Sequence, residues 1–153
     1  SSKAWGIARA GNIIGYGDRS PGRLLPDIAR SFETKEALAV RNPSHVRPWQ
    51  HVLECVSAYQ HILDYVSKDL NAGSCEIFNV GPDASSSFSV GDVVMQASKT
   101  VEFNVLSHSP TQNNLLETPE LQLSSQKATE ILDWMPKLSF EESISWTLSP
   151  LKD

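Results

Sequence analysis

The sequence feature that most constrains the fold is a long helical repeat of apolar residues between positions 53 and 69. The apolar residues that recur at helical spacing are Leu53, Val56, Tyr59, Leu63, Val66 and Leu70. The Asn-Ala-Gly sequence at 71–73 then supplies a stop signal. We therefore expect one long helix here, with this apolar face buried.

Shorter patterns on both sides of this helix alternate between strand and helix. Strands are predicted at 5–10, 38–41, 75–81 and 102–107, and helices at 25–34, 90–101 and in the segments "SSQKATEILDW" and "SFEESISWTL". Ser89 with Asp92, and Ser139 with Glu142, have the spacing of capping boxes. Ala128, Ile131 and Leu132 are expected on one side of their helix, and 11–22 and 108–120 are expected to be loops. The mixture predicts an α/β or α+β protein.

Length and composition favour one domain over residues 1–153. The chain is 40% hydrophobic and 20% charged, and it has no apolar run long enough to cross a membrane. Residues 1–30 do not have the pattern of a signal peptide. Cys55 and Cys75 are too few and too isolated for a disulfide framework or a zinc site. We expect two free, buried thiols in a cytoplasmic protein, and no metal site.

Charge is distributed unevenly along the chain. The net charge of -5 argues against a nucleic-acid partner, but the first 50 residues hold eight Lys and Arg against four acidic residues. All six arginines lie in the first 47 residues. The planar guanidinium can bind phosphate through two parallel hydrogen bonds. A small anionic ligand near this end and a simple solvated surface are both open at this point.

Several catalytic and binding signatures are missing from the sequence. It has no G-x-G-x-x-G after a strand, no P-loop and no nucleophile elbow. Its four histidines do not have a chelating spacing, and His61 is expected to have a structural role on its helix.

Six segments together resemble a known family. They are "ARAGNIIGYGD", "RLLPDIAR", "RNPSHVRPWQHVLE", "FNVGP", "SSQKATEILDWMP" and "SFEESI". They occur in the order found in CDP-glucose 4,6-dehydratases, which belong to the extended short-chain dehydrogenase/reductases, and the pattern RNPxxxRPWQHVLE is the most specific of them. The resemblance implies an α/β fold: a C-terminal substrate-binding lobe with the last Rossmann strand, a small mixed sheet and helices.

The resemblance also implies that the catalytic groups lie outside this chain. In the family, the Gly-rich NAD site, the acid/base centre and a Tyr-x-x-x-Lys pair all precede the strand that corresponds to "WGIARA". Tyr16, Tyr59 and Tyr65 have no lysine four residues later. We therefore expect no catalytic residue here, no bound NAD and no dehydratase activity of the chain alone.

Seven residues are candidates for binding the nucleotide sugar by resemblance. They are Arg47, Asn12, Arg23, Arg41, Asn42, Asn79 and Glu117. Arg47 corresponds to the family's diphosphate ligand, and the neighbouring Pro48 and Trp49 are expected to stiffen its segment. Asn12 matches a residue near the sugar phosphate and Arg23 a basic residue near the nucleotide. Arg41 and Asn42 correspond to residues that border the pyrimidine and ribose, and Asn79 stands at a strand end facing the site. Glu117 corresponds to a residue that contacts the ribose, although relatives usually show His-Glu where this chain has Leu-Glu.

Two functions of different kinds remain open from the sequence. The first is the CDP-glucose-binding part of a dehydratase-like enzyme that uses NAD. The second is a non-enzymatic interaction module derived from that fold, with a homodimer as one form, because a monomer rarely tolerates a large exposed apolar patch.

Overall fold

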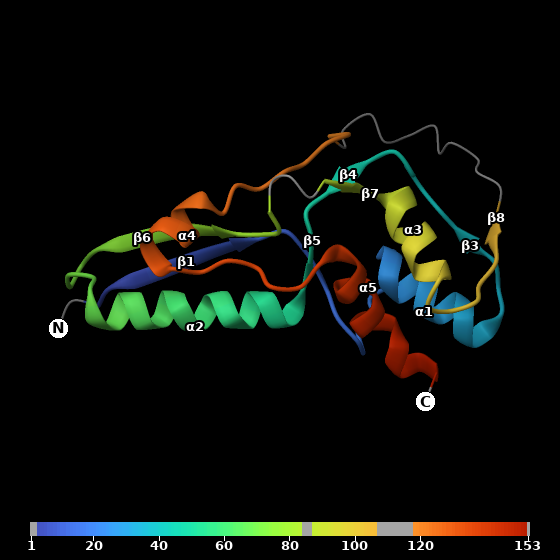
Figure 1. The fold of residues 1–153 in the computed structure, drawn as a ribbon, viewed down its shortest axis with the longest axis horizontal. Helices are drawn as coiled ribbons and strands as arrows, with labels where there is room; N and C mark the ends of the chain where they lie inside the picture. Colours follow the sequence, from blue (N-terminus) through green and yellow to red (C-terminus); the bar gives the residue numbers. More distant parts are fainter. Residues whose placement is uncertain (1–2, 84–86, 107–117, 153) are drawn as a thin grey trace.

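The computed structural model describes residues 3–83, 87–106 and 118–152. Figure 1 shows an elongated α/β molecule whose secondary structure gathers at two ends. The first described residues lie at one end and the C-terminus at the other. The mixture of helices and short strands agrees with the α/β fold expected from the sequence.

The first end is a two-stranded parallel sheet with helices against it. Strand β1 (Trp5–Ala10) pairs with β6 (Cys75–Val80), with Trp5 opposite Cys75 and Ala10 opposite Val80. Parallel neighbours need a long connection, and here it includes helix α2 (Val52–Lys68). The core of this end consists of Ala58, Ile62, Phe78, Val80, Ala128, Leu132 and Trp134.

Helix α2 has the predicted length, but the buried face differs from the prediction. Glu54, Cys55, Ala58 and Ile62 are buried, whereas much of the predicted apolar face is exposed. Leu63, for example, is 66% exposed. Helical periodicity identifies an apolar face, but only a neighbouring element can bury it. Among the described residues, none covers this face fully.

The second end holds most of the remaining helices. They are α1 (Leu24–Thr34), α3 (Val90–Ser98), α5 (Phe140–Leu148) and the 3-10 helix η1 (Ser149–Lys152). Its buried core consists of Ile14, Leu25, Ile28, Leu38, Val40, Val93, Ala97, Val101, Ile144 and Leu148. Both predicted capping boxes are present, at Ser89 with Asp92 and at Ser139 with Glu142. They fix where α3 and α5 begin.

Short strand pairs connect the helices of this second end. They are β2 (Asn12–Ile14) with β5 (Trp49–His51), β3 (Leu38–Ala39) with β8 (Val105–Leu106), and β4 (Val46–Arg47) with β7 (Phe88–Ser89). The first two pairs are parallel and the third is antiparallel. The mixed strand directions were expected, but the described strands form separate pairs and not one sheet.

Some strand predictions need correction. Residues 12–14 were assigned to a loop but form β2, and the strands predicted at 38–41 and 102–107 shrink to two residues each. Each of these strands is fixed by a partner distant in sequence, so a local pattern does not define it. The loop predicted at 108–120 lies largely outside the described residues.

The smaller helix α4 (Gln126–Leu132) and the cysteines also differ in part from expectation. Ala128 and Leu132 are buried as predicted, but Ile131 is 44% exposed. Cys55 is buried, whereas Cys75, at the first position of β6, is exposed. The prediction of two buried thiols was therefore wrong for Cys75.

His61 has the structural role that was predicted. Its Nδ1 lies 2.9 Å from the Leu132 carbonyl and so links α2 to the end of α4.

None of the helices in the described part of the chain is both long enough and apolar enough to cross a membrane.

Candidate functional site

A cavity of about 350 Å³ lies at the second end of the molecule. Its wall includes five of the seven residues predicted to bind the nucleotide sugar: Asn12, Arg23, Arg41, Asn42 and Arg47. These residues come from four separate stretches between positions 12 and 47. The fold therefore brings together three arginines and two amides around one space.

Pairing of β2 with β5 brings Asn12 close to the Arg47 segment. Asn12 lies opposite Trp49 in the parallel register, and its backbone N–H donates to the Pro48 carbonyl at 2.8 Å. Gly11 permits this approach, because a Cβ at that position would lie only 2.4 Å from the Pro48 carbonyl oxygen. Because the Asn12–Pro48 hydrogen bond joins two backbone groups, it fixes the position of the Asn12 segment relative to the Arg47 segment.

Arg47 is 9% exposed, and its guanidinium is held on the cavity wall. Nη1 donates to the carbonyls of Val46 at 2.7 Å and Pro119 at 3.3 Å. Nη2 lies 3.2 Å from Nδ1 of His45. A long side chain fixed at several atoms loses little further conformational freedom when it binds an anion.

The residues after Arg47 are held in place by burial and by a hydrogen bond. Pro48 separates β4 from β5, and its side chain is buried. The indole Nε1 of Trp49 donates to the Phe88 carbonyl at 3.0 Å. Phe88 in turn lies opposite Arg47 in the antiparallel β4–β7 pair.

The loop that carries Asn42 is anchored against the start of α3. Asn42 has φ of 46°, a left-handed conformation that asparagine adopts more readily than most residues. The His45 N–H donates to the Asn42 carbonyl at 3.0 Å, closing a turn around Pro43. The Gly91 N–H donates to the Pro43 carbonyl at 2.8 Å. This part of the cavity wall is thus held in place by backbone hydrogen bonds.

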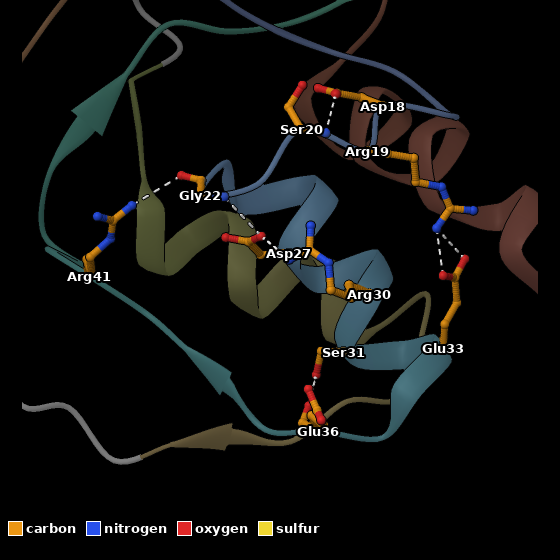
Figure 2. A network of polar contacts seen from close by, with 10 residues as sticks. All are labelled: Asp18, Arg19, Ser20, Gly22, Asp27, Arg30, Ser31, Glu33, Glu36 and Arg41. Atoms are coloured by element: carbon orange, nitrogen blue, oxygen red, sulfur yellow. Dashed lines mark hydrogen bonds and ion pairs between the residues drawn. The ribbon is translucent and has the colours of Figure 1, made fainter.

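A polar network joins exposed residues at the mouth of the cavity to α1. Figure 2 shows the contacts of this network. Nη2 of Arg41 donates to the Gly22 carbonyl at 3.2 Å, and the Gly22 N–H donates to Oδ1 of Asp27 at 3.3 Å. Arg41 and Asp27 therefore contact the same glycine from opposite sides.

Arg23 and Asp18 form a second polar pair at the mouth. Nη1 of Arg23 lies 3.3 Å from Oδ2 of Asp18. Hydrogen bonds from Ser20, and to a smaller extent the charge of Arg23, lower the pKa of the Asp18 carboxyl, against a small opposing effect of burial. Asp18 is therefore a carboxylate near neutral pH, and it competes with an incoming anion for Arg23.

The remaining arginines have other environments. Arg19 binds Glu33 through both carboxylate oxygens, and Arg30 binds Asp27 at 2.6 Å; Figure 2 shows the Arg19–Glu33 contacts. Arg9 is exposed on β1. Half of the six arginines line the cavity and half do not, so an anionic ligand bound there could meet only the first half. Such a ligand stays a prediction.

Comparison with known proteins supports the predicted relationship. The chain is 35% identical over 136 residues to CDP-glucose 4,6-dehydratase of Salmonella typhimurium strain LT2. The chain resembles one part of that dehydratase. The match takes in 89% of the chain but only 38% of the dehydratase, so the chain spans well under half of its relative's length. No protein-family model matches the chain.

Solved structures with the same fold include enzymes of nucleotide sugars. A UDP-glucose 4-epimerase from Stenotrophomonas maltophila, with bound NAD and formylated UDP-arabinopyranose, superposes with a TM-score of 0.77 at 16% identity, over 96% of this chain and 48% of the epimerase. A dTDP-glucose 4,6-dehydratase from Bacillus anthracis, in complex with NAD, has a TM-score of 0.66 at 22% identity, over 94% of this chain and 43% of the dehydratase. At these identities the likeness shows the fold alone, which is that of the extended short-chain dehydrogenase/reductases.

The residues present do not fit a dinucleotide site. Such a site needs a Gly-rich turn between a strand and a helix N-terminus. In the described ranges, the glycines between β2 and α1 stand at positions 15, 17 and 22 and so lack the G-x-G-x-x-G spacing. Helix α2 follows β5 directly, and Gly91 in the first turn of α3 packs against the Pro43 carbonyl. Among the described residues, no three or more His, Cys, Asp or Glu side chains are grouped so that they could hold a metal ion.

Of the other two predicted site residues, one does not line the cavity and one lies outside the described part of the chain. Asn79 lies on β6, opposite Arg9 in the β1–β6 sheet, and it does not line the cavity. Glu117 lies outside the described residues. Three ionisable residues that the sequence analysis did not select do line the cavity: His45, Asp18 and Asp27. A signal for His45 was its spacing of two from Arg47, because alternate residues of an extended segment lie on the same side.

Proposed function

We propose that this chain is the nucleotide-sugar-binding part, the C-terminal lobe, of a CDP-glucose 4,6-dehydratase-like enzyme, and that CDP-glucose or a close relative binds in the cavity described above. One observation carries the proposal. Five residues that the sequence resemblance assigns to nucleotide-sugar binding line a single cavity, although they come from four separate stretches of residues 12–47. The match to a CDP-glucose 4,6-dehydratase over 89% of the chain supports the same assignment.

The lining residues have the chemistry that a nucleoside diphosphate sugar requires. The fixed Arg47 guanidinium can bind two phosphoryl oxygens at once, and each charge-assisted hydrogen bond contributes roughly 1.5 to 3 kcal/mol. Arg23 and Arg41 add positive charge at the mouth, and Asn12 offers an amide that can donate without adding charge. These residues position a ligand, and none of them is placed to move a proton during the reaction.

The reaction itself belongs to parts of the enzyme outside this chain. NAD would supply hydride transfer there, because the described residues do not form a dinucleotide site. Binding energy from the nucleotide, which is remote from the reacting carbons, would hold the hexose in place for that chemistry. We therefore expect the chain alone to convert no CDP-glucose.

Calorimetry with the chain tests the binding site. CDP-glucose and CDP should bind at least tenfold more tightly than cytidine, since the arginines recognise the diphosphate. Arg47→Ala should abolish this preference, and Arg47→Lys should restore it only in part, because a point charge does not reproduce the planar fork. Arg9→Ala is the matched control, since this exposed arginine lies on β1 and outside the cavity. Equal affinity of the unaltered chain and all three variants for CDP-glucose would contradict the proposal, and so would tight binding of cytidine alone. Binding of UDP-glucose, as a further ligand, tests the preference for the base.

A second candidate function, a self-associating module, is favoured by one observation. The side chains of β1 and α2 leave an apolar groove of about 480 Å³, in which Trp5 is 61% and Leu63 66% exposed. A second copy of the chain is one occupant that would cover this groove. Light scattering at two concentrations would then show a dimer that Leu63→Glu dissociates. Met95→Glu, at an exposed apolar site on α3, is the control, and a monomer at both concentrations would reject this candidate.

A further inference from the structure

Arg41 contacts Gly22 across the mouth of the cavity. Its Nη2 donates to the Gly22 carbonyl at 3.2 Å, although the two residues are 19 positions apart in sequence. Both residues line the cavity and both are exposed, so this hydrogen bond lies where the cavity opens to solvent. Figure 2 shows the Arg41 guanidinium extending from its own segment toward the turn before α1. The hydrogen bond thus connects two sides of the mouth.

The side of the mouth that carries Arg41 is firmly attached to the fold. Val40, the preceding residue, is 7% exposed and belongs to the core of the second end. After Arg41, the Pro43 carbonyl accepts from the Gly91 N–H, in the first turn of α3, at 2.8 Å. Burial and a backbone hydrogen bond therefore fix this side.

The opposite side of the mouth is the loop 15–23, which is held by side chains close to solvent. Arg19 binds Glu33, and these two side chains are 60% and 39% exposed. Arg23 lies 3.3 Å from Asp18, and these two are 58% and 29% exposed. Ion pairs at such exposure contribute little to stability, because water screens them. The loop is therefore the side that can move.

Glycines provide a hinge at each end of the moving part. Gly17 has φ of 87° and Gly22 has φ of 76°. Glycine has access to backbone conformations on both sides of φ = 0, so it changes its dihedral angles at low cost. A few residues of this kind are sufficient for a loop to swing as a unit. Segment 18–21 lies between the two hinges.

We propose that the Arg41–Gly22 hydrogen bond is a latch across the mouth, and that Arg41 is a positioning residue that acts on ligand binding through this latch. A ligand enters and leaves when the hydrogen bond breaks and the loop swings away from Arg41. The bond forms again over the bound ligand. This inference rests on the proposed function, because it assigns a means of entry to the same binding site.

A latch has a kinetic consequence that a direct contact with the ligand does not have. The latch is closed before binding and after it, so its loss affects the free and bound states equally. The open state, through which the ligand passes, lacks the hydrogen bond in any case. Removing the latch should therefore speed association and dissociation by the same factor. An arginine that held the diphosphate directly would instead lower the affinity, mainly through faster dissociation.

Stopped-flow measurements of CDP-glucose binding test the latch, with the fluorescence of Trp49 on the cavity wall as the signal. Gly22→Ala has space for its Cβ, since the nearest heavy atom would be Nη2 of Arg41 at 3.8 Å. Alanine is strained at a φ of 76°, so the loop should move the carbonyl away from Arg41. We expect both rate constants to rise about 3- to 10-fold, the effect of one hydrogen bond on a barrier, with the affinity within about twofold.

Gly17→Ala is the matched control for Gly22→Ala. Gly17 has a similar positive φ in the same loop, and nothing lies within 4 Å of a Cβ at this position. It takes no part in the latch and does not line the cavity. Both rate constants should therefore stay as they are in the unaltered chain.

Arg41→Ala removes the donor of the latch and leaves the loop backbone unchanged. Arg41 is exposed, so this variant should fold even if Gly22→Ala does not. Its dissociation rate constant should rise by the same factor as in Gly22→Ala. The double variant should dissociate no faster than Arg41→Ala, because both substitutions remove one and the same hydrogen bond.

The possible results distinguish the latch from the function on which it rests. Additive effects in the double variant would overturn the latch and leave the nucleotide-sugar site intact. A loss of affinity in Gly22→Ala without faster association, or equal acceleration in Gly17→Ala, would have the same meaning. If CDP-glucose fails to bind the unaltered chain, the proposed function and the latch are both rejected.

Discussion

The backbone N–H of Asn12 donates to the Pro48 carbonyl at 2.8 Å, and this contact joins the two segments that carry most of the candidate site. Asn12 follows β1, whereas Pro48 lies between β4 and β5. Because Arg47 directly precedes Pro48, its position relative to Asn12 depends on this hydrogen bond and on the β2–β5 pairing beside it. The candidate site is thus sensitive to small changes beside this contact.

Gly11→Ala should disturb this contact directly. The new Cβ would lie 2.4 Å from the Pro48 carbonyl oxygen, so the backbone must move apart. We expect unfolding free energy to fall by about 1 to 3 kcal/mol and CDP-glucose affinity to fall as well. Urea denaturation and calorimetry measure the two effects.

Gly73→Ala provides the control for Gly11→Ala. Gly73 has φ of 88° in the turn before β6, remote from the cavity, so alanine there strains only the backbone. Its unfolding free energy should fall by about 1 kcal/mol with no change in ligand affinity. An equal loss of affinity in both variants would show that general destabilisation, and not the Asn12–Pro48 contact, governs binding.

Glu54 should make a large contribution to stability from its place in the first turn of α2. Its buried Oε1 accepts from the Lys137 N–H at 2.8 Å and from the Leu138 N–H at 2.7 Å. Glu54→Ala leaves both donors without this acceptor and should lower the unfolding free energy by about 2 to 4 kcal/mol. Glu54→Gln keeps an acceptor oxygen and should lose roughly half as much.

Glu141→Ala is the control for Glu54. Glu141 is exposed in the first turn of α5, so its removal should change stability by less than about 1 kcal/mol. Urea denaturation with equal m-values compares all three variants. A Glu54→Ala protein as stable as Glu141→Ala would mean that the 137–138 backbone finds other acceptors.

His51 should make stability depend on pH. Burial lowers the pKa of its imidazole, and the Glu54 charge opposes this only in part. Below about pH 6.5 the unfolded chain therefore binds more protons at this residue than the folded chain does, and the unfolding free energy decreases as the pH falls. The neutral ring is also the N-cap of α2, where Nδ1 accepts from the Leu53 N–H at 3.3 Å.

His51→Asn isolates this effect, because asparagine also caps a helix but does not titrate. Between pH 7.5 and pH 5.5, the unaltered chain should lose more unfolding free energy than His51→Asn, by at most about 1.4 kcal/mol per pH unit. Chemical denaturation at three pH values measures both slopes. Parallel slopes would assign the pH dependence to other residues.

The two thiols should react at very different rates. Cys75 is exposed, whereas Cys55 is buried, and this burial raises the pKa of its thiol to about 11. Because the thiolate is the reactive form, iodoacetamide at pH 8 should modify Cys75 alone in the folded protein and both residues in urea. Peptide mass spectrometry identifies the site, and rapid labelling of Cys55 without denaturant would show that the β5–α2 junction opens readily.

Local features of this protein were predictable because their determinants lie close together in sequence. The span of α2 follows from apolar residues three and four positions apart, and the starts of α3 and α5 follow from capping boxes three residues wide. The segment around Arg47 was also recognisable, since its arginine, proline and tryptophan are contiguous. Residue type and short spacing were sufficient for these predictions.

Tertiary structure decided which faces are covered and which residues share the cavity. Strand β2 exists because β5 lies beside it, and the apolar face of α2 remains exposed because no described element packs fully over it. Pairings between segments distant in the chain place His45 on the cavity wall and Asn79 in the β1–β6 sheet, away from the cavity. Burial and strand pairing are properties of two surfaces at once, so a pattern within one segment cannot determine them.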